Sequence, residues 1–139
     1  TEPLRELLKK SRKTKGSEEN LIRSIIEDRL AFGFENLDRF LFVFAEILRD
    51  SELRQKFSEQ VIVPLVAFPE SYLSAKIASG DFRPVDHKII FRAMFGMVIG
   101  FVLLRKLEGE NSPTRGMTAH KLAEQLADFA LYGLKARNI

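Results

Sequence analysis

The side chains able to bind a metal or attack a substrate are few in this sequence. It holds two histidines, His87 and His120, and no cysteine. Without cysteine there is no thiolate nucleophile, and neither histidine lies in a His-x-x-x-His or Glu-x-x-His spacing. No Ser-His-Asp order, glycine-rich phosphate loop or pair of carboxylates can be argued either. We therefore expect no enzyme, no cofactor and no metal site.

One charged residue interrupts the longest apolar segment of the chain. Arg92 is the only charge between Lys88 and Arg105. Its guanidinium could meet an acidic ligand head, such as a carboxylate or a phosphate. The alternative, which we favour, is that it pairs with an acid of the same chain or points to solvent.

Length and composition limit the class of protein. The chain has 139 residues, of which 45% are hydrophobic and 29% charged, as is ordinary for one globular domain. Lysine and arginine number 22 against 19 acidic residues, an excess too small to indicate a nucleic-acid surface. The lack of cysteine fits a reducing compartment, and the charged start "TEPLRELLKK" is unlike a signal peptide. The longest uncharged run, Ala93–Leu104, is shorter than the ~20 residues that span a bilayer. We expect a cytoplasmic protein that contacts no membrane.

The elements that must position any site are helices. Apolar residues recur mostly at spacings of three and four, and strict alternation is nearly absent, which predicts an all-α fold of one compact multi-helix domain over residues 1–139. Ser17, Asn36 and either Asp50 or Ser51 are suited to cap helices. The predicted helices are Pro3–Lys10, Ser17 to about Gly33, Leu37–Asp50, Glu52–Ser79, Val85–Leu107 and Thr118 to Lys135 or Ala136.

Two of these helices carry further predictions. The helix that starts at Leu37 is apolar almost all round, a pattern typical of a helix at the centre of its domain. Pro64 lies inside the next helix, which we expect to kink or to split near Val63.

Small residues recur along the last two predicted helices. Such spacing lets two helix backbones approach closely. One interpretation is a homodimer interface, in which both helices meet their symmetry mates as a four-helix bundle. The other is that the small faces pack only on each other within one subunit. Two nearly fully apolar helices are hard to bury in a monomer of this size, which favours the dimer. The expected interface residues are Ala93, Gly96, Met97, Gly100, Leu104, Ala119, Ala123, Leu126, Ala130 and Gly133.

The order of three segments resembles the C-terminal domain of tetracycline-repressor-like (TetR-family) transcriptional regulators. The segments are "RDSELRQKF", "ASGDFRPVDHKIIFRAMFGMVIGFVLLRKLEG" and "LAEQLADFALYGLKA". In that family a "G-x-F-R/x-x-D" turn precedes the penultimate helix, and a Gly-Leu pair, here Gly133-Leu134, closes the last one. The resemblance covers roughly Glu2 to Arg137.

One departure from the family is large. Its members begin with a helix-turn-helix DNA-binding domain, which nothing before Ser17 is long enough to encode. The resemblance therefore implies the effector-binding and dimerisation part of a repressor, with DNA contacted only through an N-terminal domain absent from this chain.

The resemblance also implies a cavity for a hydrophobic or amphipathic small-molecule effector among the central helices. Aromatic and methionine side chains suit such a cavity, and seven of the 12 phenylalanines lie between Phe32 and Phe68. The alternative for each ring is plain core packing. The residues expected to line the site are Phe40, Phe44, Phe68, Tyr72, Phe91, Arg92, Met94 and Phe95.

A second class of protein remains open. The chain could be a helical protein-interaction or lipid-handling module that never had a DNA-binding domain.

Overall fold

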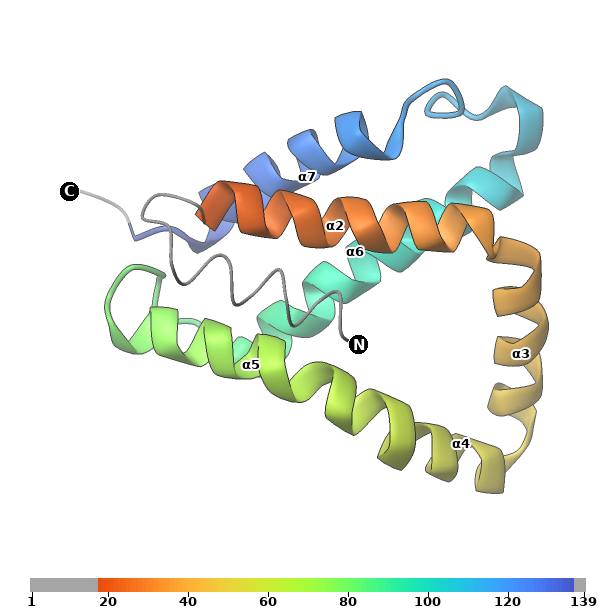
Figure 1. Cartoon of the computed structure of the whole chain (residues 1–139), viewed down its shortest axis with the longest axis horizontal. Helices are drawn as coiled ribbons and strands as arrows, with labels where there is room; N and C mark the ends of the chain where they lie inside the picture. The colour runs from red at the N-terminus through yellow and green to blue at the C-terminus, as the bar shows by residue number, and fades with distance from the viewer. Residues whose placement is uncertain (1–17, 137–139) are drawn as a thin grey trace. The chain divides into compact units, whose positions relative to one another are not determined.

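The computed structural model describes residues 18–136, except for the side chain of Phe68. The expected helix Pro3–Lys10, the cap at Ser17 and the end of the chain from Arg137 lie outside the described residues. Within them the fold is all-α, as predicted, with no strand beyond one isolated β-bridge (Figure 1). The helices are α2 (Glu18–Glu35), α3 (Leu37–Arg49), α4 (Ser51–Phe57), α5 (Val63–Ala78), α6 (His87–Glu108) and α7 (Ala119–Leu134).

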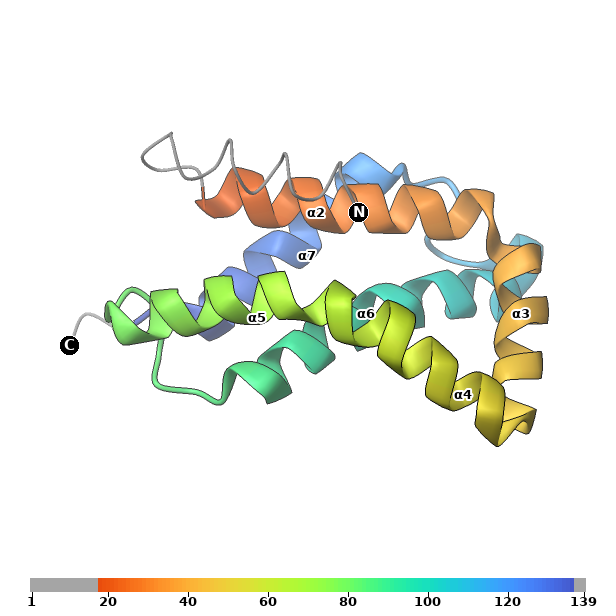
Figure 2. The ribbon, with the colours of Figure 1, turned by 60° about the horizontal axis from the view of Figure 1, so that its bottom comes forward.

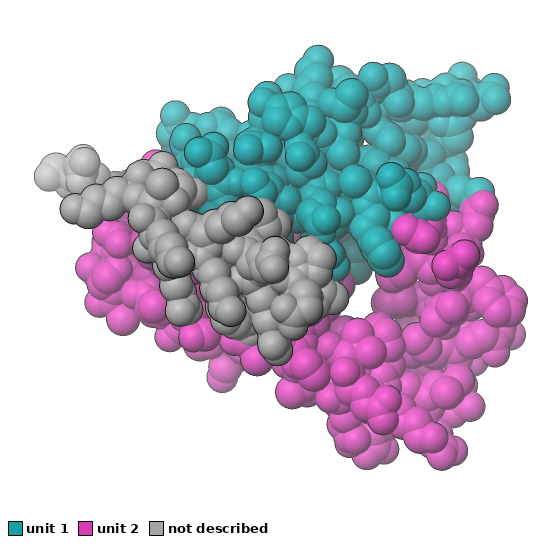
Figure 3. Space-filling view, viewed as in Figure 1, with its two compact units in different colours: residues 1–35, 97–134 teal, residues 36–96, 135–139 magenta. Residues whose placement is uncertain are grey.

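The chain divides into two compact units, coloured separately in Figure 3. Unit 1 comprises the residues up to Glu35 together with Met97–Leu134. Unit 2 comprises Asn36–Gly96 and the residues from Lys135 onward. Helix α6 is continuous and contributes its first half to unit 2 and its second half to unit 1.

The core of unit 1 lies between α2 and α7, which run side by side in two views (Figures 1 and 2). The small side chains Ala123 and Ala127 of α7 are buried, and they let the two helix axes approach closely. Apolar side chains at helical spacing fill the contact. The buried residues are Leu21, Ile22, Ile26 and Leu30 of α2, Val102 of α6, and Leu122, Ala123, Ala127, Leu131 and Leu134 of α7.

Within unit 1, Gly33 lies where α2 contacts Val102 in the second half of α6. A Cβ atom placed on Gly33 would lie 2.7 Å from Cγ2 of Val102, closer than van der Waals contact allows. Val102 is itself buried and β-branched, so it cannot easily turn away. The glycine that weakens the helical pattern of α2 is therefore required by a close approach.

Unit 2 begins with α3, whose position corrects one expectation. We expected this helix to be central, but none of its residues is buried, and Phe42, Val43 and Leu48 are exposed. The helix contacts that the structure describes for α3 are with its sequence neighbour α4. The charged residues Asp38, Arg39, Glu46 and Arg49 lie on one side of the helix, so its pattern is that of an amphipathic surface helix.

Two local predictions in unit 2 are confirmed. Asp50 caps α4, because its side chain accepts hydrogen bonds from the backbone N–H groups of Glu52 and Leu53. The long helix expected from Glu52 changes form before Pro64, through a π-helical turn at Ser58–Ile62, and α5 starts at Val63. Proline lacks the N–H that would continue the α-helical ladder, so a change of helix type beside it is expected.

The turn between α5 and α6 is fixed by Phe82, which is buried. Gly80 has a φ of 86°, a left-handed conformation that favours glycine. The backbone of Phe82 donates to the carbonyl of Lys76 and forms an antiparallel β-bridge with Lys135. The residues that follow α7 thus pair with the turn that precedes α6, and all of them belong to unit 2.

Candidate functional site

The aromatic residues expected to line a ligand site all belong to unit 2, and their ring contacts form two groups. On α3, the ring centroids of Phe40 and Phe44 are 4.9 Å apart. Phe44 also meets Phe57 of α4 edge-on, with centroids 6.3 Å apart. Sequence reasoning missed Phe57, because its partner lies across a helix break and outside any helical period.

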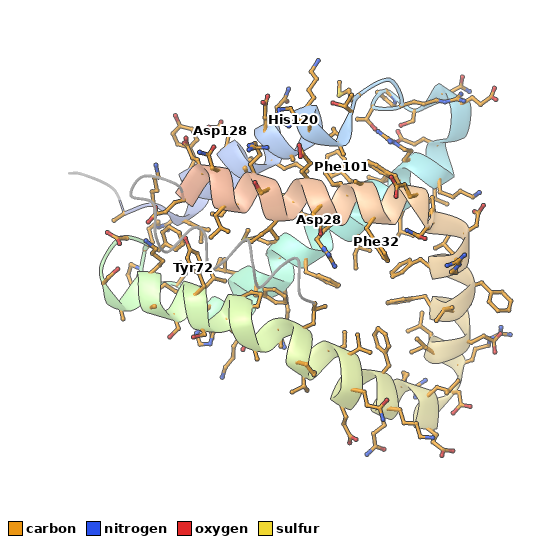
Figure 4. The ribbon with its side chains drawn as sticks, in the orientation of Figure 1. Asp28, Phe32, Tyr72, Phe101, His120 and Asp128 are labelled. Atoms are coloured by element: carbon orange, nitrogen blue, oxygen red, sulfur yellow. The ribbon has the colours of Figure 1, made fainter. Side chains whose placement is uncertain are left out.

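The second group lies on the first half of α6. Phe91 and Phe95 are stacked with ring centroids 6.1 Å apart, as residues four apart on a helix can be. Met94 lies between them in sequence and is half-buried. Tyr72 of α5 is also half-buried, and the ammonium of Lys76 lies 5.9 Å from the centroid of its ring. Figure 4 labels Tyr72 on this helix.

Arg92 pairs with an acid of the same chain, which is the alternative that we favoured from the sequence. Its Nη1 atom lies 3.2 Å from Oε1 of Glu70 on α5 and 3.0 Å from the carbonyl oxygen of Lys88 on its own helix. The guanidinium therefore pairs with an acid of the same chain. This ion pair joins α5 to the helix that carries Phe91 and Phe95.

The exposed side of α6 carries an apolar stripe, defined here as Ile89, Ala93, Gly96, Gly100, Leu104 and Leu107. Ile89, Leu104 and Leu107 are exposed, Leu107 to 80%. A Cβ atom placed on Gly96 or on Gly100 would meet no atom within 4 Å, so neither glycine is required by a contact within the described chain. Four of the expected interface residues belong to this stripe, and Met97 beside it is half-buried.

On α7 one expected interface residue is misplaced. Ala123 is fully buried in the packing of α7 on α2, so it cannot contact a partner, and its expected role is wrong. The sequence periodicity predicted that the small residues of α7 share one face. It could not predict which face of α7 is covered by α2.

The remaining expected residues of α7 lie at or near its surface. Ala119, Leu126 and Ala130 are half-buried, and Gly133 is exposed. Sequence reasoning left out Phe129 and Tyr132, which are 73% and 81% exposed. Their size could have drawn attention to them. A large ring on a helix rich in small residues must either pack against another element or remain exposed.

A half-buried charge of unit 1, Arg105, was not singled out from the sequence. Its guanidinium carbon lies 3.7 Å from the centroid of the Phe34 ring. Its Nη2 atom donates to the carbonyl oxygens of Thr114 and Met117, at 2.9 and 3.1 Å. Burial lowers the pKa of this arginine. Arg105 thus fixes the connection between α6 and α7 onto the end of α2.

His120 lies in a charged cluster at the surface of unit 1 (Figure 4). Its Nδ1 atom contacts Glu27 of α2, and its Nε2 atom lies 2.8 Å from Oε1 of Glu124. Arg23 lies 3.6 Å from the same carboxylate of Glu27. The cluster links α2 to α7. Among residues 18–136 no group of three histidine, aspartate or glutamate side chains is arranged to hold a metal ion.

Two long apolar helical stretches stand out once burial is known. Ser51–Ala78 and His87–Asn111 are long and apolar enough to cross a membrane, by length and composition alone, and only 6% of each apolar window is buried. Helices of this kind also form the cores of soluble proteins, where they are mostly buried. In the described chain, few residues of either stretch are buried.

Comparison with known proteins gives no identification. No protein-family model matches the sequence, and no curated protein matches it.

Proposed function

We propose that the chain is the ligand-sensing and dimerisation domain of a TetR-like transcriptional regulator. Its effector would be a hydrophobic or amphipathic small molecule. The observation that carries the proposal is the apolar stripe of α6, where two glycines with open space beside them lie between the exposed side chains of Ile89 and Leu107. An exposed apolar stripe of this kind is typical of a protein or membrane contact, and we infer that a second copy covers it.

The form of the stripe supports a helix crossing at its centre. Bulky side chains lie at both ends of the stripe. The residues in its middle, Ala93, Gly96 and Gly100, have small side chains or none, so the helix surface is less raised there. A symmetry-related α6 can approach most closely at such a point. Phe129 and Tyr132 are also exposed, which gives α7 apolar surface of its own.

The turn of α5–α6 supports the TetR-like part of the proposal. The two motifs that carry the resemblance, "GDFRP" and Gly133-Leu134, are far apart in the sequence. The residues of the first motif pair with those that follow the second, since Phe82 bridges Lys135 and the N–H of Ala136 donates to the carbonyl of Asp81.

The mechanism would be a shift between conformations. The expected ligand residues lie in unit 2, most of the expected interface residues lie in unit 1, and α6 contributes to both units. A ligand that binds one arrangement of unit 2 more tightly than another favours that arrangement. Through the dimer it would then change the spacing of the DNA-binding domains of the parent protein.

Two measurements test the proposal. Sedimentation velocity at micromolar concentration should find a dimer. A thermal-shift screen across fatty acids, fatty alcohols and aromatic compounds should find at least one that raises the melting temperature, since a ligand that binds only the folded state stabilises it. A monomer that no compound stabilises would contradict the proposal.

The alternative function is a helical interaction or lipid-handling module without a DNA-binding domain. The two exposed apolar helices, Ser51–Ala78 and His87–Asn111, favour it. Flotation with phosphatidylcholine and phosphatidylglycerol vesicles separates the two functions. A dimer that remains unbound supports the regulator, whereas a monomer that floats with vesicles supports the lipid-handling module.

A further inference from the structure

We propose that the π-helical turn Ser58–Ile62 is a rotational latch within unit 2. The turn contains one residue more than an α-helical turn, and Pro64 keeps that residue in place. The extra residue sets the side of α5 on which α4 and α3 are held. Without it, both helices would rotate about the helix axis by about 100°, the angle of one residue in an α-helix. The latch is independent of the proposed function.

The latch lies in the middle of a long helical segment. Ser51–Ala78 runs as one helix of 28 residues, in which α4 leads into α5 through the π-helical turn (Figures 1 and 2). At the end of the turn, the N–H of Val63 donates to the carbonyl of Ser58, five residues earlier. In an α-helix the acceptor lies four residues earlier. The turn therefore encloses one additional residue.

Pro64 supplies a reason for the wider turn. In an unbroken α-helix the N–H of residue 64 would donate to the carbonyl of Gln60. Proline has no N–H, and its ring collides with the carbonyl four residues earlier. The collision is relieved when the helix widens just before the proline, as at other π-helical turns beside helix distortions.

The extra residue decides the side to which Phe57 belongs. Phe57 and Leu73 are 16 positions apart by their numbers, which in an unbroken α-helix places them about 160° apart around the axis. One extra residue in the turn reduces this angle to about 60°. Burial agrees with the smaller angle. Leu73 is 5% exposed, and Phe57 is half-buried, whereas the other residues of α4 are exposed.

Little else holds α3 and α4 in this position. The ring of Phe44 on α3 meets that of Phe57 edge-on, so α3 turns together with α4. Among the described residues, the main helix contacts of α3 and α4 are with each other and with the π-helical turn. No residue of either helix is buried. A rotation would therefore break little packing, and the turn itself holds the position.

Spin labels measure the rotation. The sequence has no cysteine, so cysteines introduced at the exposed residues Ala45 of α3 and Ser71 of α5 are the only labelling sites. Double electron–electron resonance gives the distance between the labels, with labelled chains diluted in unlabelled ones. Pro64→Ala should change the mean distance by about 10 Å, because α3 is ~20 Å long and turns by about 100°. Pro69→Ala is the matched control, because it removes a proline of α5 away from the turn and should leave the distance unchanged.

A deletion separates rotation from any other effect of the proline. Deletion of Gln60 in the Pro64→Ala variant shortens the spacing of Phe57 and Leu73 by one residue. An unbroken α-helix then places the two residues about 60° apart again. The double variant should therefore return the distance to its wild-type value. A merely destabilising effect of Pro64→Ala would not be reversed by removal of a residue.

Three results would contradict the latch. They are an unchanged distance in Pro64→Ala, an equal change in Pro69→Ala, and a change that deletion of Gln60 does not reverse. Circular dichroism shows whether each variant is folded. If Pro64→Ala does not fold, the double variant still decides, because it keeps the wild-type side of Phe57 and gains a better helix former. An unfolded double variant, or one whose distance departs from wild type, would overturn the latch.

Discussion

Phe82 and Lys135, 53 positions apart by their numbers, face each other in an antiparallel β-bridge. Phe82 is 1% exposed, and the N–H of Ala136 donates to the carbonyl of Asp81 at 3.3 Å. The last residues described thus pair with the turn that leads into α6. The bridge and this hydrogen bond thus join residues 135 and 136 to residues 81 and 82, all of which belong to unit 2.

Replacement of the buried ring should be costly. We expect Phe82→Ala to lower the free energy of unfolding by about 3 kcal/mol, because it leaves a cavity under the turn and weakens the bridge to Lys135. Urea denaturation followed by circular dichroism measures the loss. Phe42→Ala is the control, since Phe42 is exposed and its removal should cost well under about 1 kcal/mol. Equal losses for the two variants would contradict the role of Phe82.

Gly33 should not tolerate a side chain. We expect Gly33→Ala to lower the free energy of unfolding by about 1–2 kcal/mol, even though alanine favours a helix, because the new Cβ would clash with Val102. The double variant Gly33→Ala with Val102→Ala should recover most of the clash energy in a double-mutant cycle. Additive losses would show that the two residues are not in contact.

Arg105 should hold the α6–α7 connection. In Arg105→Leu the carbonyls of Thr114 and Met117 lose their donor, and the Phe34 ring loses its cation. We expect a loss of about 2 kcal/mol in unfolding free energy. Hydrogen exchange should become faster in residues 109–118. Arg49→Leu, which removes an exposed ion pair, is the control and should change neither quantity appreciably. Unchanged exchange in 109–118 would contradict the role of Arg105.

Much of the local structure could be predicted from the sequence. The 3–4 spacing predicted the α-helices among residues 18–136, with α4 and α5 as one helix, and Asp50 was one of the two capping candidates before α4. The missing N–H of Pro64 predicted a kink or a split near Val63, and the structure changes there from a π-helical turn to α5. These features depend on neighbours within a few residues, which are visible in the chain itself.

Which faces of the helices are buried by other helices could not be predicted in the same way. Ala123 and Gly133 share one small-residue stripe, yet the first is buried against α2 and the second is exposed. Helix α3 was expected at the centre of its domain but has no buried residue. The partner of Arg105, Phe34, lies 71 positions away by number. Which face of a helix is buried depends on how the helices are arranged in space. A local sequence pattern does not carry this information.

The most direct test of the central claim, that the α6 stripe is a subunit interface, is sedimentation velocity of Gly100→Leu at micromolar concentration. The new side chain enters open space in the isolated chain, so it should leave the fold intact but separate two helices that cross there. Gly116→Leu is the matched control, because Gly116 also has open space and lies in the loop before α7. We expect a dimer for wild type and Gly116→Leu and a monomer for Gly100→Leu. A wild-type monomer, or an undiminished Gly100→Leu dimer, would contradict the claim.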